Sequence, residues 1–167
     1  MPAWHPRTLN PADLPGLMAV QHACYGDEFV ESAAVFARRI DSPADCSLVI
    51  EHGGRIRAYL AAYRSRLAKV TPLHGDFEAV THPDTLYLHD MAVLPGHAGE
   101  GMAHALLGSV RRMARDARLP YSGLVSVQGS RAYWERQGYA VHALADEAQR
   151  ERLAGYGGDA VYMLARL

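Results

Sequence analysis

Two groups that can exchange protons stand side by side in one apolar, β-favouring segment. The segment spans residues 86–93 and places His89 directly before Asp90. Free imidazole titrates near ~6.5 and suits a general base at neutral pH, whereas a carboxylate needs its pKa raised by burial. Because side chains alternate along a strand, we expect His89 and Asp90 to point to opposite faces of the sheet, so that only one meets a substrate. We favour His89 as the base, with Asp90 as the alternative.

A glycine-rich turn follows this segment and leads into a helix. Residues 94–101 contain three glycines and one proline. The segment after the turn carries apolar residues at helical spacing, namely Met102, Leu106, Val110, Met113 and Ala117. The first N–H groups of a helix lack intrahelical partners, and the helix dipole favours negative charge there. A strand, a glycine turn and a helix in this order therefore predict an anion-binding site.

Two common phosphate-binding motifs are excluded by the residues around this turn. A P-loop needs Lys followed by Ser or Thr after its last glycine, but Met102 and Ala103 follow Gly101. A dinucleotide-binding fingerprint needs a third glycine where His104 stands. Neither motif therefore identifies the anion that would bind at this turn.

The remaining pattern is the segment Ala98-Gly99-Glu100-Gly101-Met102-Ala103. It resembles the acyl-CoA pyrophosphate loop of the GCN5-related N-acetyltransferase (GNAT) family, written Gln/Arg-x-x-Gly-x-Gly/Ala. One position departs from the family, because Ala98 stands where the family has Arg or Gln. The backbone N–H groups survive this change, but a charged or polar side-chain contact is lost.

A second segment supports the resemblance independently. The family carries a pattern of the form aromatic-Tyr-x-x-x-Gly-Phe on a helix after the next strand. Tyr133-Trp134 and Gly138-Tyr139 match it in residue type and spacing, with Trp134 in the usual Tyr place and Tyr139 in the usual Phe place. Both motifs occur in the family's order.

The resemblance implies a fold, a reaction and a co-substrate. The fold would be α/β (α+β), with a mixed, mostly antiparallel sheet of about six to seven strands, a central parallel βαβ pair and about four helices on both faces. The reaction would transfer an acetyl group from acetyl-CoA to a primary amine of a small molecule or peptide, by direct attack in a ternary complex. Coenzyme A would enter as a co-substrate, and no metal is implied.

The resemblance also assigns residues to the two substrates. The peptide groups that would contact the acyl and pantetheine parts belong to Met91, Ala92 and Val93. The other cofactor-binding residues would be His97, Ala98, Gly99, Glu100, Gly101, Met102, Ala103, Ser130, Tyr133 and Trp134. The connection between the first two helices would border the acceptor through Tyr25, Glu28 and Phe29. Tyr133 is also the candidate proton donor to the leaving thiolate, because the indole of Trp134 is not a practical acid.

Two other functions compete with this one. A catalytically weak, CoA-binding module of the same fold is favoured by Ala98 and Trp134, which depart from the family pattern. A His-based metalloprotein is suggested by the nine histidines, but no His pair or His/Cys cluster has the spacing of metal ligands.

The rest of the chain predicts the elements that position these residues. Strands are expected over residues 4–9, 46–51, 55–63, 121–127, 140–144 and 160–166. Further helices are expected from Asn10 to Gly26, from Glu31 to Ser42, within residues 130–139 and over 146–154. The turn His52-Gly53-Gly54 predicts a hairpin, and the helix after the glycine turn predicts a right-handed crossover between parallel strands. Residues 64–84 lose periodicity and predict a long loop, either a lid or a mobile segment, in which Leu73 and Phe77 either pack over a pocket or anchor the loop to the core.

Composition limits the environment and the partners. We expect 1–167 to be a single domain, with 49% hydrophobic and 21% charged residues. The formal net charge of −1 gives no reason to expect a nucleic-acid partner. We expect no membrane association and a cytoplasmic location, because no apolar run has the length of a signal core or a membrane span. The two cysteines have no metal-type or redox spacing, and a homodimer is compatible with the sequence.

Overall fold

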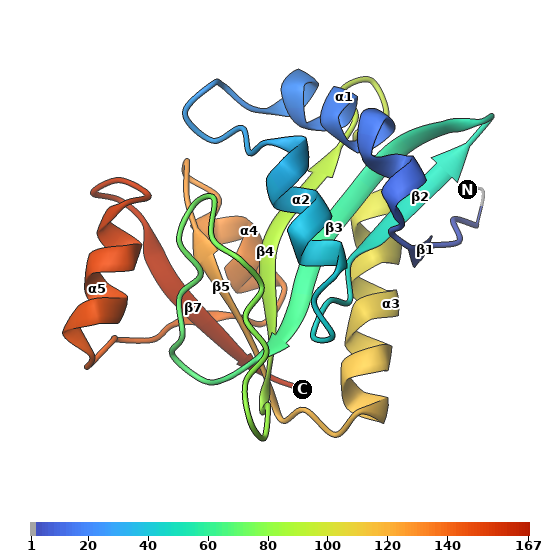
Figure 1. Cartoon of the computed structure of the whole chain (residues 1–167). Coiled ribbons are helices and arrows are strands. Elements are labelled where there is room, and N and C mark those ends of the chain that lie inside the picture. Colours follow the sequence, from blue (N-terminus) through green and yellow to red (C-terminus); the bar gives the residue numbers. More distant parts are fainter. Residues whose placement is uncertain (1–2) are drawn as a thin grey trace.

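The computed structural model describes residues 3–167, whose seven strands form one mixed sheet with helices on both faces (Figure 1). The strands are β1 (Arg7–Thr8), β2 (Leu48–His52), β3 (Arg55–Ser65), β4 (Thr85–Val93), β5 (Tyr121–Ser126), β6 (Ala140–Val141) and β7 (Val161–Arg166). The helices are the 3₁₀ turn η1 (Pro11–Asp13), α1 (Leu14–Cys24), α2 (Ala33–Ile40), α3 (Met102–Asp116), α4 (Arg131–Arg136) and α5 (Glu147–Ala154). This architecture confirms the fold class predicted from the sequence.

The sheet has the order β1-β2-β3-β4-β5-β7-β6, and only β4 and β5 pair in parallel. Helix α3 makes the crossover between those two strands, as the sequence predicted. The β2–β3 hairpin turns at Gly53 and Gly54, whose φ angles of 61° and 74° suit glycine. Strand β1 differs most from its expected range of 4–9, since it spans only Arg7–Thr8, and β6 ends at Val141 and not near residue 144.

Helices cover the two faces of the sheet through separate hydrophobic clusters. On one face, Leu17 and Val20 of α1 and Phe36 of α2 pack against β3 and β4, and Leu153 of α5 lies at the edge of the same cluster. On the other face lie α3 and α4, packed through Leu106, Val110 and Trp134 among others. The apolar stripe of α3 is narrower than expected, because Met113 is 37% exposed at its rim while Ala114 is buried.

Local sequence sets the starts of the helices. The Ser32 hydroxyl accepts a hydrogen bond from the Val35 N–H at 3.2 Å and begins α2. Asp146 caps α5 in the same way through the Ala148 N–H, at 2.8 Å. Before α1, the Asn10 N–H donates to the Asp13 carboxylate at 3.0 Å, so the expected cap at Asn10 leads first into η1.

The long connection between β3 and β4 is anchored in the core. Phe77 is 1% exposed and stacks on Tyr63, with ring centroids 4.4 Å apart. The Ser42 hydroxyl donates to the Phe77 carbonyl oxygen at 2.6 Å. The connection is therefore fixed at its middle, which agrees with the alternative that Phe77 anchors the loop to the core and not with a mobile segment.

Strand β4 carries a β-bulge at its centre. Ala61 of β3 pairs with Asp90 and Ala62 pairs with Leu88, so His89 has no partner residue on β3. The extra residue shifts the alternation of side chains by one position. His89 and Asp90 consequently lie on the same face of the sheet, and the prediction that they point to opposite faces is wrong.

Candidate active site

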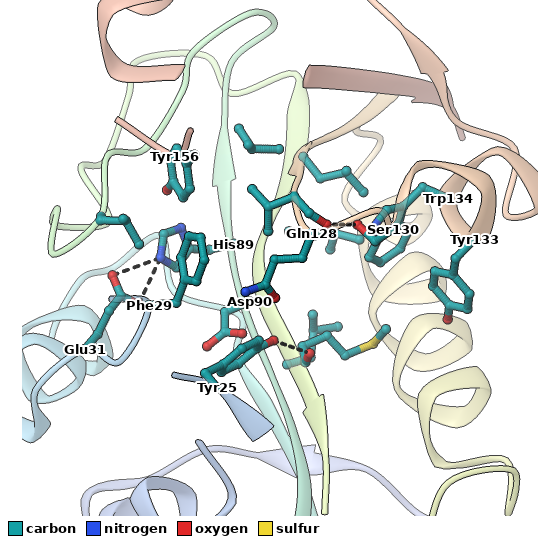
Figure 2. A pocket seen from close by; sticks show the side chains of 17 residues that line it. Tyr25, Phe29, Glu31, His89, Asp90, Gln128, Ser130, Tyr133, Trp134 and Tyr156 are labelled. Carbon is teal, nitrogen blue, oxygen red and sulfur yellow. Dashed lines mark hydrogen bonds and ion pairs between the residues drawn. The ribbon is translucent and has the colours of Figure 1, made fainter. Parts of the chain in front are cut away.

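A cavity of about 280 Å³ opens where β4 and β5 separate. The two strands pair only from Thr85/Tyr121 to Leu88/Leu124, and beyond that point they diverge (Figure 1). One side of the cavity is formed by the α1–α2 connection and the bulge of β4, and the other by the segment after β5 and helix α4 (Figure 2). It brings His89, Asp90 and Met91 of β4 together with Tyr133 and Trp134 of the second motif.

The open edge of β4 presents main-chain groups to this cavity. The Leu94 N–H donates to the Arg57 carbonyl oxygen at 2.7 Å. This bond shows which peptide groups of β4 point toward β3 and which point away from it. By the alternation of an antiparallel ladder, the peptide groups of Asp90 and Ala92 face β3, and those of Met91 and Val93 face the opening. The carbonyl oxygen of Met91 accepts from the Tyr25 hydroxyl at 2.9 Å. An extended ligand with amide groups can pair with the remaining groups of this edge.

Asp90 is the acidic group at the centre of the cavity. Burial raises the pKa of its carboxyl, while a hydrogen bond from the Tyr59 hydroxyl acts in the opposite direction. Burial also raises the pKa values of Tyr25 and Tyr59, so both hydroxyls stay protonated and act as donors. No arginine, lysine or histidine within residues 3–167 forms an ion pair with Asp90. The carboxylate can therefore attract a cation or accept a proton.

His89 lines the same cavity but directs its ring at Glu31. The Nε2 atom lies 3.0 Å from Oε1 and 3.1 Å from Oε2 of Glu31 (Figure 2). An Arg39 nitrogen also lies 3.2 Å from Nε2, but the two carboxylate oxygens are nearer and favour the tautomer with hydrogen on Nε2. The side chain is 2% exposed, and Nδ1 is buried without a hydrogen-bond partner among the described residues.

Glu31 is also held by a buried cation. Arg39 donates to its two oxygens at 2.8 and 2.6 Å, and both residues are at most 2% exposed. Burial favours the neutral acid, but the interactions with His89 and Arg39 outweigh it and lower the pKa of Glu31 below its ordinary value. Glu31 also accepts from the His74 N–H at 2.8 Å. Through these contacts Glu31 connects α2, the β3–β4 connection and the bulge.

The glycine turn before α3 exposes main-chain donors. Gly96, Gly99 and Gly101 all have positive φ angles, between 81° and 93°. Within residues 3–167, the N–H groups of Gly101, Met102 and Ala103 have no acceptor, although Ala105 already bonds to Gly101. Three open donors at the start of a fifteen-residue helix are the groups that an anion site in this position requires.

The side chains of the turn are engaged with one another. His97 Nδ1 lies 3.0 Å from Glu100 Oε2, and His97 Nε2 lies 3.3 Å from an Arg57 nitrogen. The Trp4 indole donates to the Glu100 carbonyl oxygen at 2.7 Å. Ala98 is exposed beside them. The predicted cofactor contacts of this turn therefore fall to its main chain.

Comparison with known proteins decides the family. A sequence model described as the acetyltransferase (GNAT) family matches residues 14–139. This chain belongs to that family. The matched range contains the glycine turn, the open edge of β4 and the second aromatic motif, so the resemblance drawn from the two motifs is confirmed.

Solved structures share the GNAT fold at low sequence identity. The ribosomal-protein-S18-alanine N-acetyltransferase from Escherichia coli is 16% identical, with a TM-score of 0.71, and the match covers 98% of this chain and 94% of that chain. The PaiA N-acetyltransferase from Thermoplasma acidophilum, in complex with coenzyme A, is 10% identical, with a TM-score of 0.71 and 99% of each chain covered. The GphF GNAT-like decarboxylase, in complex with isobutyryl-CoA, is 18% identical, with a TM-score of 0.76 and coverage of 97% and 98%. None of the curated protein sequences compared with this chain matches it significantly.

The second aromatic motif of this GNAT protein lies across the cavity from the bulge. Tyr133 and Trp134 both line the cavity, and their rings meet edge to face at 4.9 Å. Burial raises the pKa of the Tyr133 hydroxyl. The Ser130 hydroxyl also lines this side and donates to the Val127 carbonyl oxygen at 2.7 Å. The motif thus closes the cavity opposite Asp90.

The predicted acceptor residues divide into two groups. Tyr25 and Phe29 line the cavity, whereas Glu28 is exposed and is not among the lining residues. The acid that this connection does contribute is Glu31, which the sequence analysis did not select. Arg39 was a usable signal, because an arginine on the inner side of a helix needs a buried acid.

Two further properties concern the described residues as a whole. Within residues 3–167, His, Cys, Asp and Glu side chains form no group of three or more that could hold a metal ion. Over the same range, the helices fall short of the length and apolarity required to cross a bilayer.

Proposed function

We propose that this GNAT protein transfers the acetyl group of acetyl-CoA to a primary amine held beside Asp90. The observation that carries the proposal is the position of this carboxylate. Asp90 lines the cavity, has no ion-pair partner among the described residues and adjoins the open peptide groups of β4. The acidic group that would act as the base therefore lies next to the strand edge that would bind the acyl arm.

The co-substrate would span two parts of the molecule. Its pyrophosphate would accept hydrogen bonds from the N–H groups of Gly101, Met102 and Ala103 at the positive end of the α3 dipole. Its pantetheine arm would pair with the open edge of β4 at Met91 and Val93. These contacts are main-chain contacts, which explains how binding could tolerate the alanine at position 98.

The acceptor needs a base because an alkylamine, with a pKa near ~10.4, is mostly protonated at neutral pH. In this proposal the Asp90 carboxylate attracts the ammonium group and takes one of its protons, directly or through a water molecule. The freed nitrogen lone pair attacks the thioester carbonyl carbon, the nitrogen releases its second proton to solvent, the C–S bond breaks and the thiolate leaves, so that a neutral amide forms. The Met91 N–H faces the opening and can stabilise charge on the thioester oxygen.

Asp90 is better suited than His89 to act as the general base. Nε2 of His89 is occupied by Glu31, and Nδ1 is buried, so neither ring nitrogen is open to an amine. We propose that His89, held by Glu31 and Arg39, positions the bulge and thereby the carboxylate next to it. Tyr133 is the candidate donor to the leaving thiolate, with solvent as the alternative source of the proton.

A turnover assay tests the proposal. The protein is incubated with acetyl-CoA and a panel of primary amines, CoA thiol release is followed, and the product is checked for one added acetyl group by mass spectrometry. The proposal expects thiol release that depends on the amine, and much weaker release in the Asp90→Asn variant. Binding of acetyl-CoA without turnover of any amine would support the CoA-binding module instead, which the departures at Ala98 and Trp134 favour.

A further inference from the structure

We infer that the acceptor is a compact primary monoamine with an apolar body and no carboxylate group. The inference rests on the acetyl transfer proposed above and concerns one part of the cavity, the acceptor lobe. We define the acceptor lobe by the residues of the α1–α2 connection, the β3–β4 connection, the bulge and the segment after α5 that line it. They are Tyr25, Phe29, Glu31, Leu73, His89, Asp90 and Tyr156.

The charges of the acceptor lobe select a cation. Glu31 is neutralised by Arg39, which donates to both of its oxygens. Asp90 accepts a hydrogen bond from the Tyr59 hydroxyl and forms no ion pair with an arginine, lysine or histidine within residues 3–167. With His89 as the neutral Nε2–H tautomer, the lobe carries one unbalanced negative charge, and an ammonium group is the natural complement.

The lobe offers no cation to a carboxylate. None of the cavity-lining residues within residues 3–167 is an arginine or a lysine. An imidazolium of His89 could not serve, because Nε2 faces Glu31 and Nδ1 is buried. In an amino acid the carboxylate lies one carbon from the amine, so it would sit near Asp90 without a counter-ion. Like charges in that arrangement oppose binding.

The walls of the lobe favour an apolar body of small size. Tyr25, Phe29 and Tyr156 surround the bulge residues with aromatic surface (Figure 2). Leu73 adds aliphatic surface to the lining. A polyamine would need a second unpaired acid for its second ammonium, and Glu31 is already neutralised by Arg39. The whole cavity measures about 280 Å³ and must also admit the acyl arm. Pockets for drug-sized ligands typically measure about 300–1,000 Å³, so the acceptor must be compact.

Matched amines test the inference. Each of two monoamines, 2-phenylethylamine and isoamylamine, is compared with the amino acid and the amino alcohol of the same skeleton: phenylalanine with phenylalaninol, and leucine with leucinol. The amino alcohol controls for size because it replaces the carboxylate by a neutral group. We expect kcat/KM for the monoamines and amino alcohols to exceed that for the amino acids by about 100-fold or more. Spermidine and a short peptide complete the panel, and both should be poor acceptors.

Failure of the inference is distinct from failure of the proposed function. If amino acids, spermidine or the peptide are acetylated as well as the monoamines, the substrate class is wrong while acetyl transfer stands. If no amine in the panel is acetylated by protein that binds acetyl-CoA, both are wrong.

A pair of variants tests separately whether Phe29 contacts the apolar body of the acceptor. Phe29→Ala should raise KM for 2-phenylethylamine by about tenfold, with a smaller change for ethylamine, because it removes surface that only the larger body can contact. Phe29→Leu is the matched control and should keep most of the affinity for 2-phenylethylamine. Equal effects of Phe29→Ala on both amines would show that the residue has a general structural role, and would overturn its assignment to the acceptor lobe.

Discussion

His89 and Asp90 are neighbours in the sequence and yet lie on the same face of β4. The bulge opposite Ala61 and Ala62 produces this arrangement by leaving His89 without a partner residue on β3. The two side chains nevertheless have different surroundings. His89 turns to the buried Glu31, while Asp90 turns to the hydroxyls of Tyr25 and Tyr59. His89 is therefore suited to stabilise the bulge of β4, and Asp90 is suited to contact a substrate.

The glycine turn gives the first prediction. Gly101 has a φ of 90°, which a β-branched residue adopts only with strain, and its N–H is one of the open donors. Gly101→Val should weaken acetyl-CoA binding by at least about tenfold, as measured by isothermal titration calorimetry. Gly108→Ala is the control, because that glycine is inside α3 and a methyl group there meets only ordinary contacts. If Gly101→Val binds as tightly as the control, the anion site lies elsewhere.

The missing cation at position 98 gives a second prediction. Ala98 is exposed next to the open N–H groups, and a long basic side chain there can reach a bound pyrophosphate. Ala98→Arg should gain about 1 kcal/mol of binding free energy, or several-fold in affinity for CoA. The gain should shrink at high salt, because the contact is exposed. Weaker binding would mean that His97 or Arg57 already occupies that space.

The buried ion pair gives a prediction about stability. Glu31→Gln leaves Arg39 without a counter-charge inside the protein, so the free energy of unfolding should fall by about 3–5 kcal/mol at neutral pH. Chemical denaturation measures this difference. Arg39→Met combined with Glu31→Gln should restore part of the lost stability, because no charge then remains unpaired. A single variant as stable as the wild type would mean that the pair contributes nothing.

The same pair predicts a pH dependence of unfolding. Because the folded protein lowers the pKa of Glu31, its contribution to stability is complete above the ordinary value of 4.5 and is lost as the pH falls below it. The stability difference between wild type and Glu31→Gln should therefore narrow as the pH is lowered from about 5 to 3. A difference that stays constant over this range would contradict the assignment of the lowered pKa.

Much of the fold follows from local sequence. The glycine turn, the apolar stripe of α3 and the hairpin glycines each specify one geometry, so the crossover and the parallel pair could be predicted. Tyr133 and Trp134 could be assigned to the cavity because their spacing to Gly138 matches a family pattern. Tyr25 and Phe29 could be assigned because the connection that carries them borders the acceptor in that family.

The catalytic centre could not be predicted to the same depth. A bulge depends on the pairing of two strands, and nothing in residues 86–93 marks its position, so strict alternation placed His89 and Asp90 wrongly. The partner of Arg39 depends on packing between distant segments, so Glu28 was selected and Glu31 was not. The choice between a pocket cover and a core anchor at Phe77 stayed open, because its contact with Tyr63 depends on packing that periodicity does not reveal.

The pH dependence of acetyl transfer in Asp90→Asn tests the central claim most directly. In the wild type, kcat/KM for a monoamine should fall at acidic pH as Asp90 is protonated, at a pH above the ordinary range of aspartic acid because burial raises its pKa. Asp90→Asn should lower kcat by about 10²-fold or more and remove that limb, with acetyl-CoA affinity nearly unchanged. His89→Gln is the matched variant and should keep the limb. Loss of the limb in His89→Gln, together with its survival in Asp90→Asn, would contradict the account and return the role of base to His89.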